Sequence, residues 1–281
     1  MEADFTLVPI GGLGNRINAI CSAIVYCQQQ HKSLNILWFR DHGLNCPVSE
    51  LFSLNNSLKD VFLRDAGYLD LLLRDNPRRK NFYIPKLFQK FLFDRSIYTE
   101  EVYHVVSSCT QPDFGCLDNF RRIFMVSYWR FWESPDMWKS IVVKENIKKQ
   151  VDEHFKRLAK KRVVGIHIRR TDNAYSVNES PLNLFIDKIE EEISVYGEDV
   201  VFYLASDSKE VKEELKEKFN QYIYTLEKPV IRNSKEGIID AFVEMNVLSK
   251  TNKLYASSKS SFSELAHLLS DNDFEELKIV R

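Results

Sequence analysis

The second half of the chain alternates short β-branched runs with helical periodicities, and this alternation restricts the fold more than any other feature. Arg162 to Ile168 reads RVVGIHI and Val200 to Ala205 reads VVFYLA, both typical of strands buried on two faces. Between such runs, apolar residues recur every three or four positions, which predicts helices. The predicted order is helix 147–158, strand 162–168, helix 182–193, strand 200–205, helix 209–219, strand 222–225, helix 237–249, strand 253–256 and helix 261–269. This order is typical of a doubly wound, parallel α/β domain.

The chain opens with a second unit of the same kind. Thr6 to Ile10 predicts a strand, a glycine loop follows at residues 11–15, and apolar residues recur at helical spacing from Ile17 to Cys27. Leu34 to Phe39 predicts the next strand, so the start reads β–loop–α–β. Such a start favours a parallel sheet in the first half as well.

Residues 45–120 show no clean period, except for an aromatic and basic stretch at 86–93. We interpret that stretch as a core-facing helix with solvated lysines, in preference to a substrate- or lipid-facing surface. The polar stretch before residue 150 is the predicted boundary. The fold prediction is therefore two Rossmann-like α/β domains facing a cleft, one at 1–145 and the other at 146–281.

Charge and cysteine usage exclude several classes of protein. The 39 basic and 40 acidic side chains nearly cancel, so bulk charge gives no reason to expect nucleic acid or an anionic membrane as the main partner. No apolar segment approaches the ~18 residues of a membrane span, and Met1 to Ile10 do not show the basic and apolar pattern of a signal peptide. The five cysteines lack CxxC spacing, which favours reduced thiols in a cytoplasmic protein; they are Cys21, Cys27, Cys46, Cys109 and Cys116.

Two adjacent arginines follow the strand RVVGIHI, at the edge of the sheet where open α/β folds bind ligands. Successive side chains of an extended chain face opposite ways, so Arg169 and Arg170 need not do the same work. One can hold phosphate oxygens while the other pairs with Asp172 and braces the loop. His167 shares a face with Arg169. A solvated loop with an ordinary Arg–Asp pair is the alternative.

Two further loops end predicted strands at the same edge. Asp207 could accept hydrogen bonds from a base or a ribose, although an N-cap for the helix 209–219 explains it equally well. Ser260 and Ser261 begin the helix 261–269, where hydroxyl and backbone N–H groups suit a phosphate. Capping of that helix is again the alternative.

The glycine loop and a DxD sequence are the remaining motifs. Gly12 and Gly14 fit the first two glycines of the dinucleotide fingerprint, but Ile17 stands in place of the third; Asp41 would be the acidic partner. The loop allows close approach of a ligand, with Asn15 as an amide donor. Asp271-Asn272-Asp273 has the form of a metal motif, but we interpret it as a polar turn and expect no metal.

Taken in order, the segments GGLGNR, GIHIRRTD, FYLASDS and EGIIDAFVEMNVLSKTNKLYASSKSSFSELA resemble the fucosyltransferase superfamily that includes α-1,2-, α-1,6- and protein O-fucosyltransferases. The similarity is patchy over residues 1–40 and continuous in kind over 160–270. Tyr128-Trp129 also resembles an aromatic motif of bacterial α-1,2 members. The resemblance implies a GT-B enzyme that inverts the anomeric centre without a metal, taking fucose from GDP-fucose to a glycan acceptor.

The resemblance also implies roles for individual residues. Arg169 would bind the diphosphate and stabilise the departing GDP, in the central catalytic role. In α-1,6 members a glutamate lies five residues beyond the motif aspartate; Val177 is found there, so Asp172 and Glu179 are the nearby substitutes. The residues expected to bind or border the donor are Gly12, Gly14, Asn15, His167, Arg170, Asp207, Asp240, Ser260 and Ser261. The acceptor, the linkage and the oligomeric state do not follow from the sequence.

Three other functions compete with this interpretation. A related transferase could use another nucleotide sugar on the same scaffold. A non-catalytic protein could bind nucleotide or carbohydrate on a decayed transferase fold, although the intact arginine pair argues against decay. A nicotinamide dehydrogenase is disfavoured by the incomplete glycine fingerprint.

Overall fold

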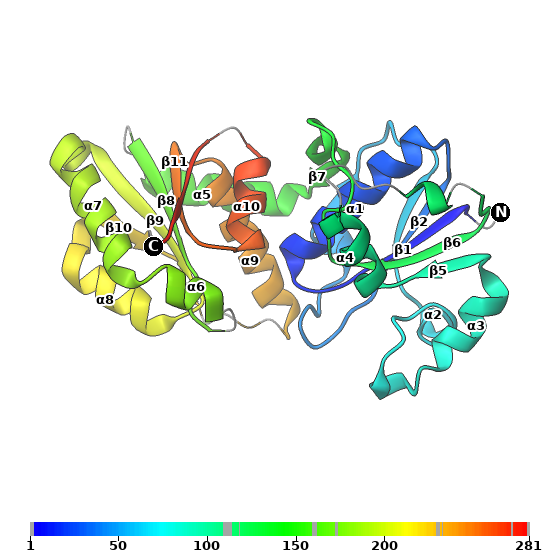
Figure 1. The fold of residues 1–281 in the computed structure, drawn as a ribbon. Coiled ribbons are helices and arrows are strands. Elements are labelled where there is room, and N and C mark those ends of the chain that lie inside the picture. Colours follow the sequence, from blue (N-terminus) through cyan, green and yellow to red (C-terminus); the bar gives the residue numbers. More distant parts are fainter. Residues whose placement is uncertain are drawn as a thin grey trace. The chain divides into compact units, whose positions relative to one another are not determined.

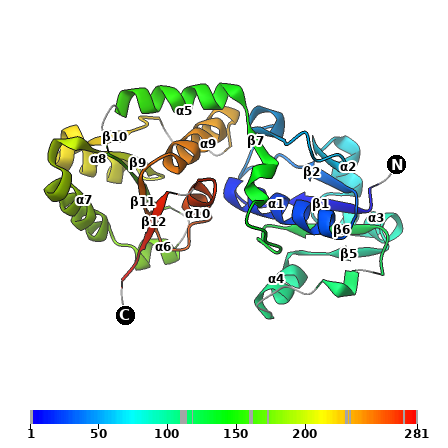
Figure 2. The same ribbon diagram turned by 90° about the horizontal axis from the view of Figure 1, so that it is seen from above.

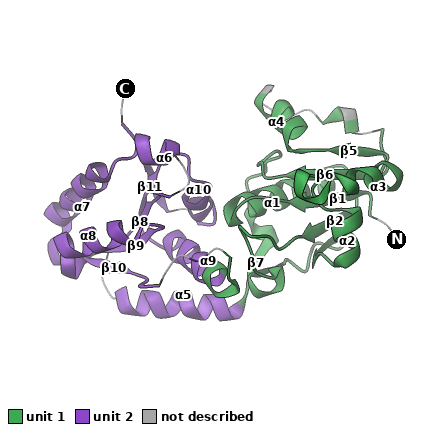
Figure 3. Cartoon of the chain, turned by 90° about the horizontal axis from the view of Figure 1, so that it is seen from below, with its two compact units in different colours: residues 1–144, 232–238 green, residues 145–231, 239–281 purple. Residues whose placement is uncertain are grey.

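The computed structural model of the chain describes residues 3–108, 114–117, 119–158, 162–171, 174–228, 231, 233–270 and 272–279. The chain forms two compact units, which Figure 3 shows in different colours. The first unit comprises Met1–Lys144 and Arg232–Ile238, and the second comprises Glu145–Ile231 and Ile239–Arg281. Each unit is built on a parallel sheet of its own.

The second unit holds a five-stranded sheet with the order β10-β9-β8-β11-β12, in which every neighbouring pair is parallel. Its strands are β8 (Arg162–Ile168), β9 (Val200–Ser206), β10 (Ile223–Thr225), β11 (Lys253–Ser257) and β12 (Asp273–Leu277). Its helices are α5 (Glu145–Leu158), α6 (Ala174–Glu179), α7 (Leu182–Tyr196), α8 (Lys209–Phe219), α9 (Lys235–Ser249) and α10 (Ser261–Leu268), and the first turn of α9 is counted with the first unit. Helices cover both faces of this sheet (Figure 2).

The central strand β8 shows why both faces are covered. Ile166 and Ile168 pack into an apolar cluster with side chains of α7 and α8. The alternate residues point to the other face, where His167 stacks on Phe262 of α10. Gly165 lies on that face too, and a Cβ atom added to it would come within 3.0 Å of Leu248 in α9. The absence of a side chain at this position therefore lets α9 approach the sheet.

The first unit holds a five-stranded parallel sheet with the order β4-β2-β1-β6-β5 and a separate antiparallel pair, β3 with β7. Its strands are β1 (Phe5–Pro9), β2 (Leu34–Trp38), β3 (Phe52–Leu54), β4 (Val61–Asp65), β5 (Arg95–Ile97), β6 (Ile123–Ser127) and β7 (Ile141–Val143). Its helices are α1 (Leu13–Gln29), α2 (Tyr68–Leu73), α3 (Ile84–Leu92) and α4 (Thr99–Ser108), and α2 and α3 lie side by side (Figure 1). The link between the edge strands β4 and β5 runs through α2 and α3.

The α/β class predicted from the sequence is confirmed, and the strands and helices predicted between residues 147 and 269 form close to their expected places. Two elements of the second unit were not predicted, α6 and β12. Asp273 begins β12, so the interpretation of residues 271–273 as a simple turn is wrong at this residue; Asp271 lies outside the described residues. Among the described helices, none is long and apolar enough to cross a membrane.

The interpretation of residues 86–93 as a core-facing helix is right only at its end, where Leu92 and Phe93 pack in the core, and is wrong for the rest of the apolar stripe. Helix α3 buries Pro85 and Gln89, while Leu87 is 59% and Phe91 is 77% exposed. Helical spacing alone does not say which of two stripes faces inward, and here a proline and an amide occupy the inner one. Leu87 and Phe91 therefore belong to the surface of the first unit.

Candidate functional site

Three loops of the second unit meet at one edge of its sheet. Strand β8 is central, β9 and β11 flank it, and all three run in the same direction. Their carboxyl ends therefore lie side by side, where open α/β sheets bind ligands. The loops carry Arg169 and Arg170 after β8, Asp207 after β9, and Ser258 to Ser260 after β11.

The carboxylate of Asp207 ties two of these loops together. It accepts a hydrogen bond from the backbone N–H of Arg170 at 2.7 Å and one from the hydroxyl of Thr171 at 2.7 Å. It also lies 3.2 Å from Nε of Arg169. The alternative role of Asp207 as an N-cap is wrong, because Ser208 caps α8 and accepts the N–H of Val211. Asp207 organises the loop after β8.

The two arginines have different surroundings. Arg170 donates from Nη1 to the carbonyl of Arg169 and from Nη2 to the carbonyl of Ser180, so it braces the loop, and burial lowers its pKa. Arg169 is anchored by Nε on Asp207 and by its backbone N–H on Ser257, while its side chain stays 21% exposed. Of the pair, Arg169 is better placed to meet an anion at the sheet edge. Asp172, the predicted partner and catalytic candidate, lies outside the described residues.

His167 is buried at the end of β8, two residues before Arg169. Its ring is buried and stacks on Phe262 with 4.9 Å between ring centroids. Burial, with the charge of Arg169 as a second cause, lowers the pKa of His167 to about 3, so the imidazole is neutral at physiological pH. Its Nδ1 has no hydrogen-bond partner within the described part of the chain. A neutral ring with one unused nitrogen can accept or donate a hydrogen bond.

The serine loop after β11 contains two kinds of side chain. Ser260 occupies the N-cap position of α10, yet its side chain makes no capping hydrogen bond, and Ser261 is the first residue of that helix. Ser258 is buried, with its hydroxyl 3.0 Å from Glu179 and 2.7 Å from Glu276. Since a hydroxyl has one proton, Ser258 can donate to only one of these carboxylates at a time. Because the Ser260 side chain does not cap α10, backbone N–H groups at the start of this helix can donate to an anion.

Glu179, at the end of α6, is the other predicted catalytic residue. Its carboxylate lies between the Ser258 hydroxyl and Nζ of Lys259, which is 3.7 Å away. The structure thus places Glu179 beside the serine loop that follows β11.

A second polar cluster lies beneath α9. Asp240 pairs with Lys228 at 2.8 Å, whereas Glu244 is buried one turn further along the helix. Nζ of Lys212 is 3.6 Å from Oε1 of Glu244, longer than a hydrogen bond, and burial raises the pKa of Glu244 to about 7. Neither this oxygen nor the hydroxyl of Tyr203 has a hydrogen-bond partner among the described residues. Buried polar atoms of this kind mark a candidate binding position.

Sequence reasoning missed Glu244, although a signal was present. It is the only charged residue between Ala241 and Ser249, in a mostly apolar stretch of helix. A charge in such a stretch is either paired or functional.

The raised pKa of Glu244 predicts a pH-dependent difference in stability from its glutamine variant. Protonated Glu244 is favoured by the fold, so its stabilising contribution is complete below about pH 4.5 and is lost as the pH rises through about 7. The unfolding free energy of the wild type, relative to Glu244→Gln, should therefore fall by roughly 2.5 kcal/mol between pH 5 and 8. Urea unfolding at both pH values measures this difference. Glu217→Gln, on the exposed side of α8, is the control, and a difference for Glu244→Gln that stays constant with pH would contradict the prediction.

The glycine loop of the first unit is shaped by Arg16. Gly11 has a φ of +84°, a conformation that favours glycine, and Gly12 is the N-cap of α1. The side chain of Arg16 is wholly buried; it donates to the carbonyls of Gly11 and Phe39 and lies 2.7 Å from Asp41. Asp41 therefore serves to hold Arg16 rather than a ribose, which removes the acidic partner of the dinucleotide fingerprint.

The other predicted residues of this loop lie next to the hydrogen bonds made by Arg16. Gly14 is buried in the first turn of α1, and the amide of Asn15 lies close to Gly11. Arg16 itself stood in the motif GGLGNR and was not singled out. Its signal is that Arg16 is the only charged residue of α1, and a charge in a buried helix needs an ion-pair or hydrogen-bond partner.

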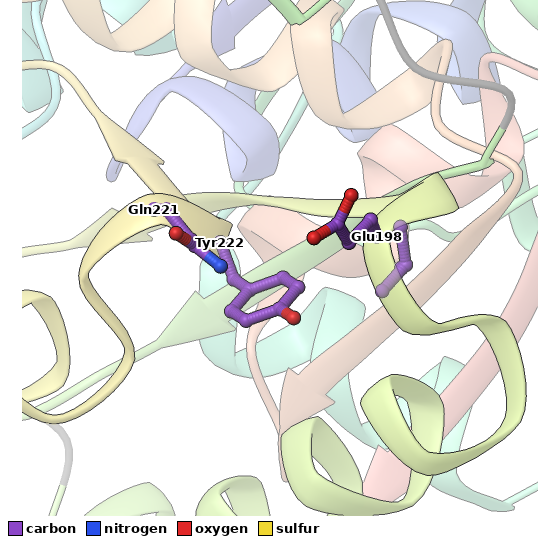
Figure 4. A pocket seen from close by; sticks show the side chains of 4 residues that line it. Glu198, Gln221 and Tyr222 are labelled. Atoms are coloured by element: carbon purple, nitrogen blue, oxygen red, sulfur yellow. The ribbon is translucent and has the colours of Figure 1, made fainter.

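A pocket of about 200 Å³ lies elsewhere in the second unit, lined by Glu198, Val200, Gln221 and Tyr222 (Figure 4). Val200 is the first residue of β9, so this pocket is at the amino edge of the sheet, opposite the arginines. Its charged residue is a carboxylate, which disfavours a phosphate ligand. Across the described residues, no group of three or more His, Cys, Asp or Glu side chains is arranged to hold a metal ion.

No protein-family model matches this chain, and no curated protein matches it by sequence. Solved structures do match. NodZ α-1,6-fucosyltransferase soaked with GDP-fucose is 17% identical, with 96% of this chain and 93% of that chain covered and a TM-score of 0.64. The fucosyltransferase NodZ from Bradyrhizobium is 16% identical, with 96% of this chain and 94% of that chain covered and a TM-score of 0.65. POFUT1 in complex with GDP-fucose is 10% identical, with 99% of this chain and 97% of that chain covered and a TM-score of 0.61.

These matches span almost the whole of each chain, so they concern the complete fold and not one domain of it. They confirm, at the level of fold, the resemblance read from the sequence motifs. The chain has the α/β fold of the fucosyltransferases NodZ and POFUT1.

Proposed function

We propose that this protein is a glycosyltransferase that moves fucose from GDP-fucose to a hydroxyl group of a glycan, with inversion at the anomeric carbon and without a metal ion. In this proposal the domain at 146–281 binds the nucleotide sugar and the domain at 1–145 serves the acceptor. The shared fold with enzymes whose structures were determined with GDP-fucose supports the choice of donor.

The observation that carries the proposal is the position of Arg169. Its guanidinium is anchored on Asp207 and stays partly exposed at the carboxyl edge of a parallel sheet. Breaking a glycosyl–phosphate bond places negative charge on the departing diphosphate. A fixed guanidinium beside that charge stabilises the transition state more than the ground state, which lowers the barrier. Arg170 and Asp207 keep the Arg169 loop in place.

The remaining donor contacts follow from the same edge. Ser260 and Ser261, at the start of α10, would offer a hydroxyl and backbone N–H groups to a phosphate. The neutral His167 would contribute a hydrogen bond without competing for the diphosphate charge. Asp240, and with it Glu244, would contact the guanine or the ribose, because carboxylates pair with the N–H and O–H groups of a nucleoside.

The acceptor side of the proposal rests on fewer observations. Gly12, Gly14 and Asn15 would border the donor, with the exposed N-terminus of α1 available to an anion. The acceptor hydroxyl must attack the anomeric carbon from the face opposite the diphosphate, and a carboxylate near it would take the proton. Asp172 and Glu179 are the candidates for that base.

Release of GDP from GDP-fucose tests the proposal. The protein, in excess EDTA and with a panel of free sugars and oligosaccharides, should release GDP from GDP-fucose faster than from GDP-mannose, and should release no UDP from UDP-galactose. Faster turnover of another donor would support a glycosyltransferase but contradict fucose as the sugar that it transfers. Tight binding of GDP without turnover of any donor would favour a non-catalytic binding protein.

A further inference from the structure

The link between β4 and β5 carries an unusual concentration of exposed apolar side chains. More than half of the large apolar residues that are exposed in the described chain lie in residues 67–93, which we call the α2–α3 segment. Tyr68 is 93% and Phe82 is 84% exposed. The full set is Tyr68, Leu69, Leu71, Leu72, Phe82, Tyr83, Ile84, Leu87 and Phe91. A patch of this kind marks an interaction surface.

The inner side of this segment is polar. Asp70 is buried and accepts hydrogen bonds from Arg64, Arg74 and the backbone of Gly67. Asp75 is buried as well. Its carboxylate accepts hydrogen bonds from Arg78 and Asn81, and its carbonyl accepts one from the buried Gln89.

Up to Phe91 the segment is therefore folded with mostly polar groups inside and apolar groups outside, and only its end, Leu92 and Phe93, packs in the apolar core. Phe93, next to α3, packs with Phe124 of β6, which fixes the segment to the sheet. The aromatic side chains are thus exposed because buried hydrogen bonds hold the segment in this orientation. Burying the patch requires a partner outside this unit.

Charge selects the kind of partner. The two acidic residues of the segment, Asp70 and Asp75, are both buried and both paired with arginines. Its exposed charges are all positive: Arg79, Lys80, Lys86 and Lys90. The whole chain has a net charge of −1, so this positive surface is local.

Helix α3 combines both properties within nine residues. Ile84, Leu87 and Phe91 form one exposed stripe at helical spacing, and Lys86 and Lys90 flank it. Aromatic and leucine side chains enter the headgroup boundary of a bilayer, while neighbouring lysines meet anionic headgroups. At six and nine residues, α2 and α3 are too short to span a bilayer and suit a position in its surface.

We propose that the α2–α3 segment docks this protein on the surface of a membrane that contains anionic lipids, with its apolar side chains in the interfacial layer. The inference is independent of the proposed fucosyl transfer, because it rests on a surface of the first unit and its test needs no turnover.

Sedimentation with sucrose-loaded vesicles tests the inference with the full chain. The wild type should bind vesicles of phosphatidylcholine mixed with phosphatidylglycerol, should bind phosphatidylcholine alone at least about tenfold more weakly, and should be released by salt. The double variants Leu87→Ser with Phe91→Ser, and Lys86→Glu with Lys90→Glu, should each weaken binding to the mixed vesicles by about tenfold or more. These side chains are exposed, so both variants should keep the thermal unfolding profile of the wild type.

Matched controls separate local from general effects. Val195→Ser with Ile279→Ser removes exposed apolar groups from the second unit, and Lys148→Glu with Lys149→Glu makes the same change in net charge on α5. Both should bind as the wild type does. Failure of the wild type to bind the mixed vesicles, or equal binding by test and control variants, would overturn the inference. A concentration-dependent dimer that Leu87→Ser with Phe91→Ser abolishes, without vesicle binding, would assign the patch to a second copy of the chain.

Discussion

Replacement of Arg169 by alanine is expected to lower the rate of GDP release from GDP-fucose by about 100-fold or more, because the variant loses a fixed positive charge beside the departing diphosphate. The loss should appear in kcat as well as in kcat/KM, since this charge is worth more in the transition state than in the ground state. Asp207 would keep its bonds to Arg170 and Thr171, so the loop should hold its place. Steady-state kinetics of the purified variant measure the effect.

Two further variants sharpen this prediction. Arg169→Lys keeps the charge but not the paired N–H geometry, so its rate should fall between the wild type and Arg169→Ala. Arg95→Ala removes an exposed, ion-paired arginine of the first unit and should leave the rate unchanged. Near-normal kcat in Arg169→Ala would reject the assignment of the site, provided that the variant unfolds at the temperature of the wild type.

Arg16→Ala is expected to lower the free energy of unfolding by roughly 3–5 kcal/mol, the range for breaking a buried ion pair from one side. The change leaves the carbonyls of Gly11 and Phe39 without a donor and the partly exposed Asp41 without its partner. It also removes the cation–π contact with Trp38, 4.9 Å from the guanidinium carbon. Urea unfolding followed by tryptophan fluorescence measures the loss.

The control for this prediction is the neighbouring Arg40, which is exposed; Arg40→Ala should change the unfolding free energy by less than about 0.5 kcal/mol. Arg16→Lys retains a charge but cannot reach three acceptors in a fork, so we expect an intermediate loss. A loss below about 1 kcal/mol in Arg16→Ala would mean that the glycine loop keeps its shape without the arginine.

The sheet of the second unit could be predicted from the sequence because its inner strands are made almost wholly of β-branched and apolar residues. Strand β12 was missed because three of the five residues in its sequence, DFEEL, are acidic; it is an edge strand that pairs with β11. The orientation of α3 was missed because the spacing of apolar residues does not show which side of a helix faces the core. Its apolar stripe is normal in spacing, and only the hydrogen bonds of the buried Gln89 reveal that the stripe faces outward.

The candidate site could be predicted where its residues directly follow recognisable strands. Arg169, Asp207 and Ser260 all follow apolar strands, and the parallel sheet brings their loops to one edge. The division of labour between Arg169 and Arg170 was not predictable, because it depends on the carbonyl of Ser180, ten residues along the chain. Glu244 and Arg16 were overlooked because each is a single charge in an apolar stretch, and their partners come from other elements.

Thermal unfolding with and without millimolar nucleotides, in EDTA, tests the central claim most directly. We predict that GDP and GDP-fucose raise the unfolding temperature while UDP and ADP do not, and that Arg169→Ala reduces the shift. Stabilisation by UDP or ADP in place of GDP would reject the guanine donor. No shift with any of these nucleotides would contradict the proposal that the edge formed by β8, β9 and β11 binds a nucleotide sugar.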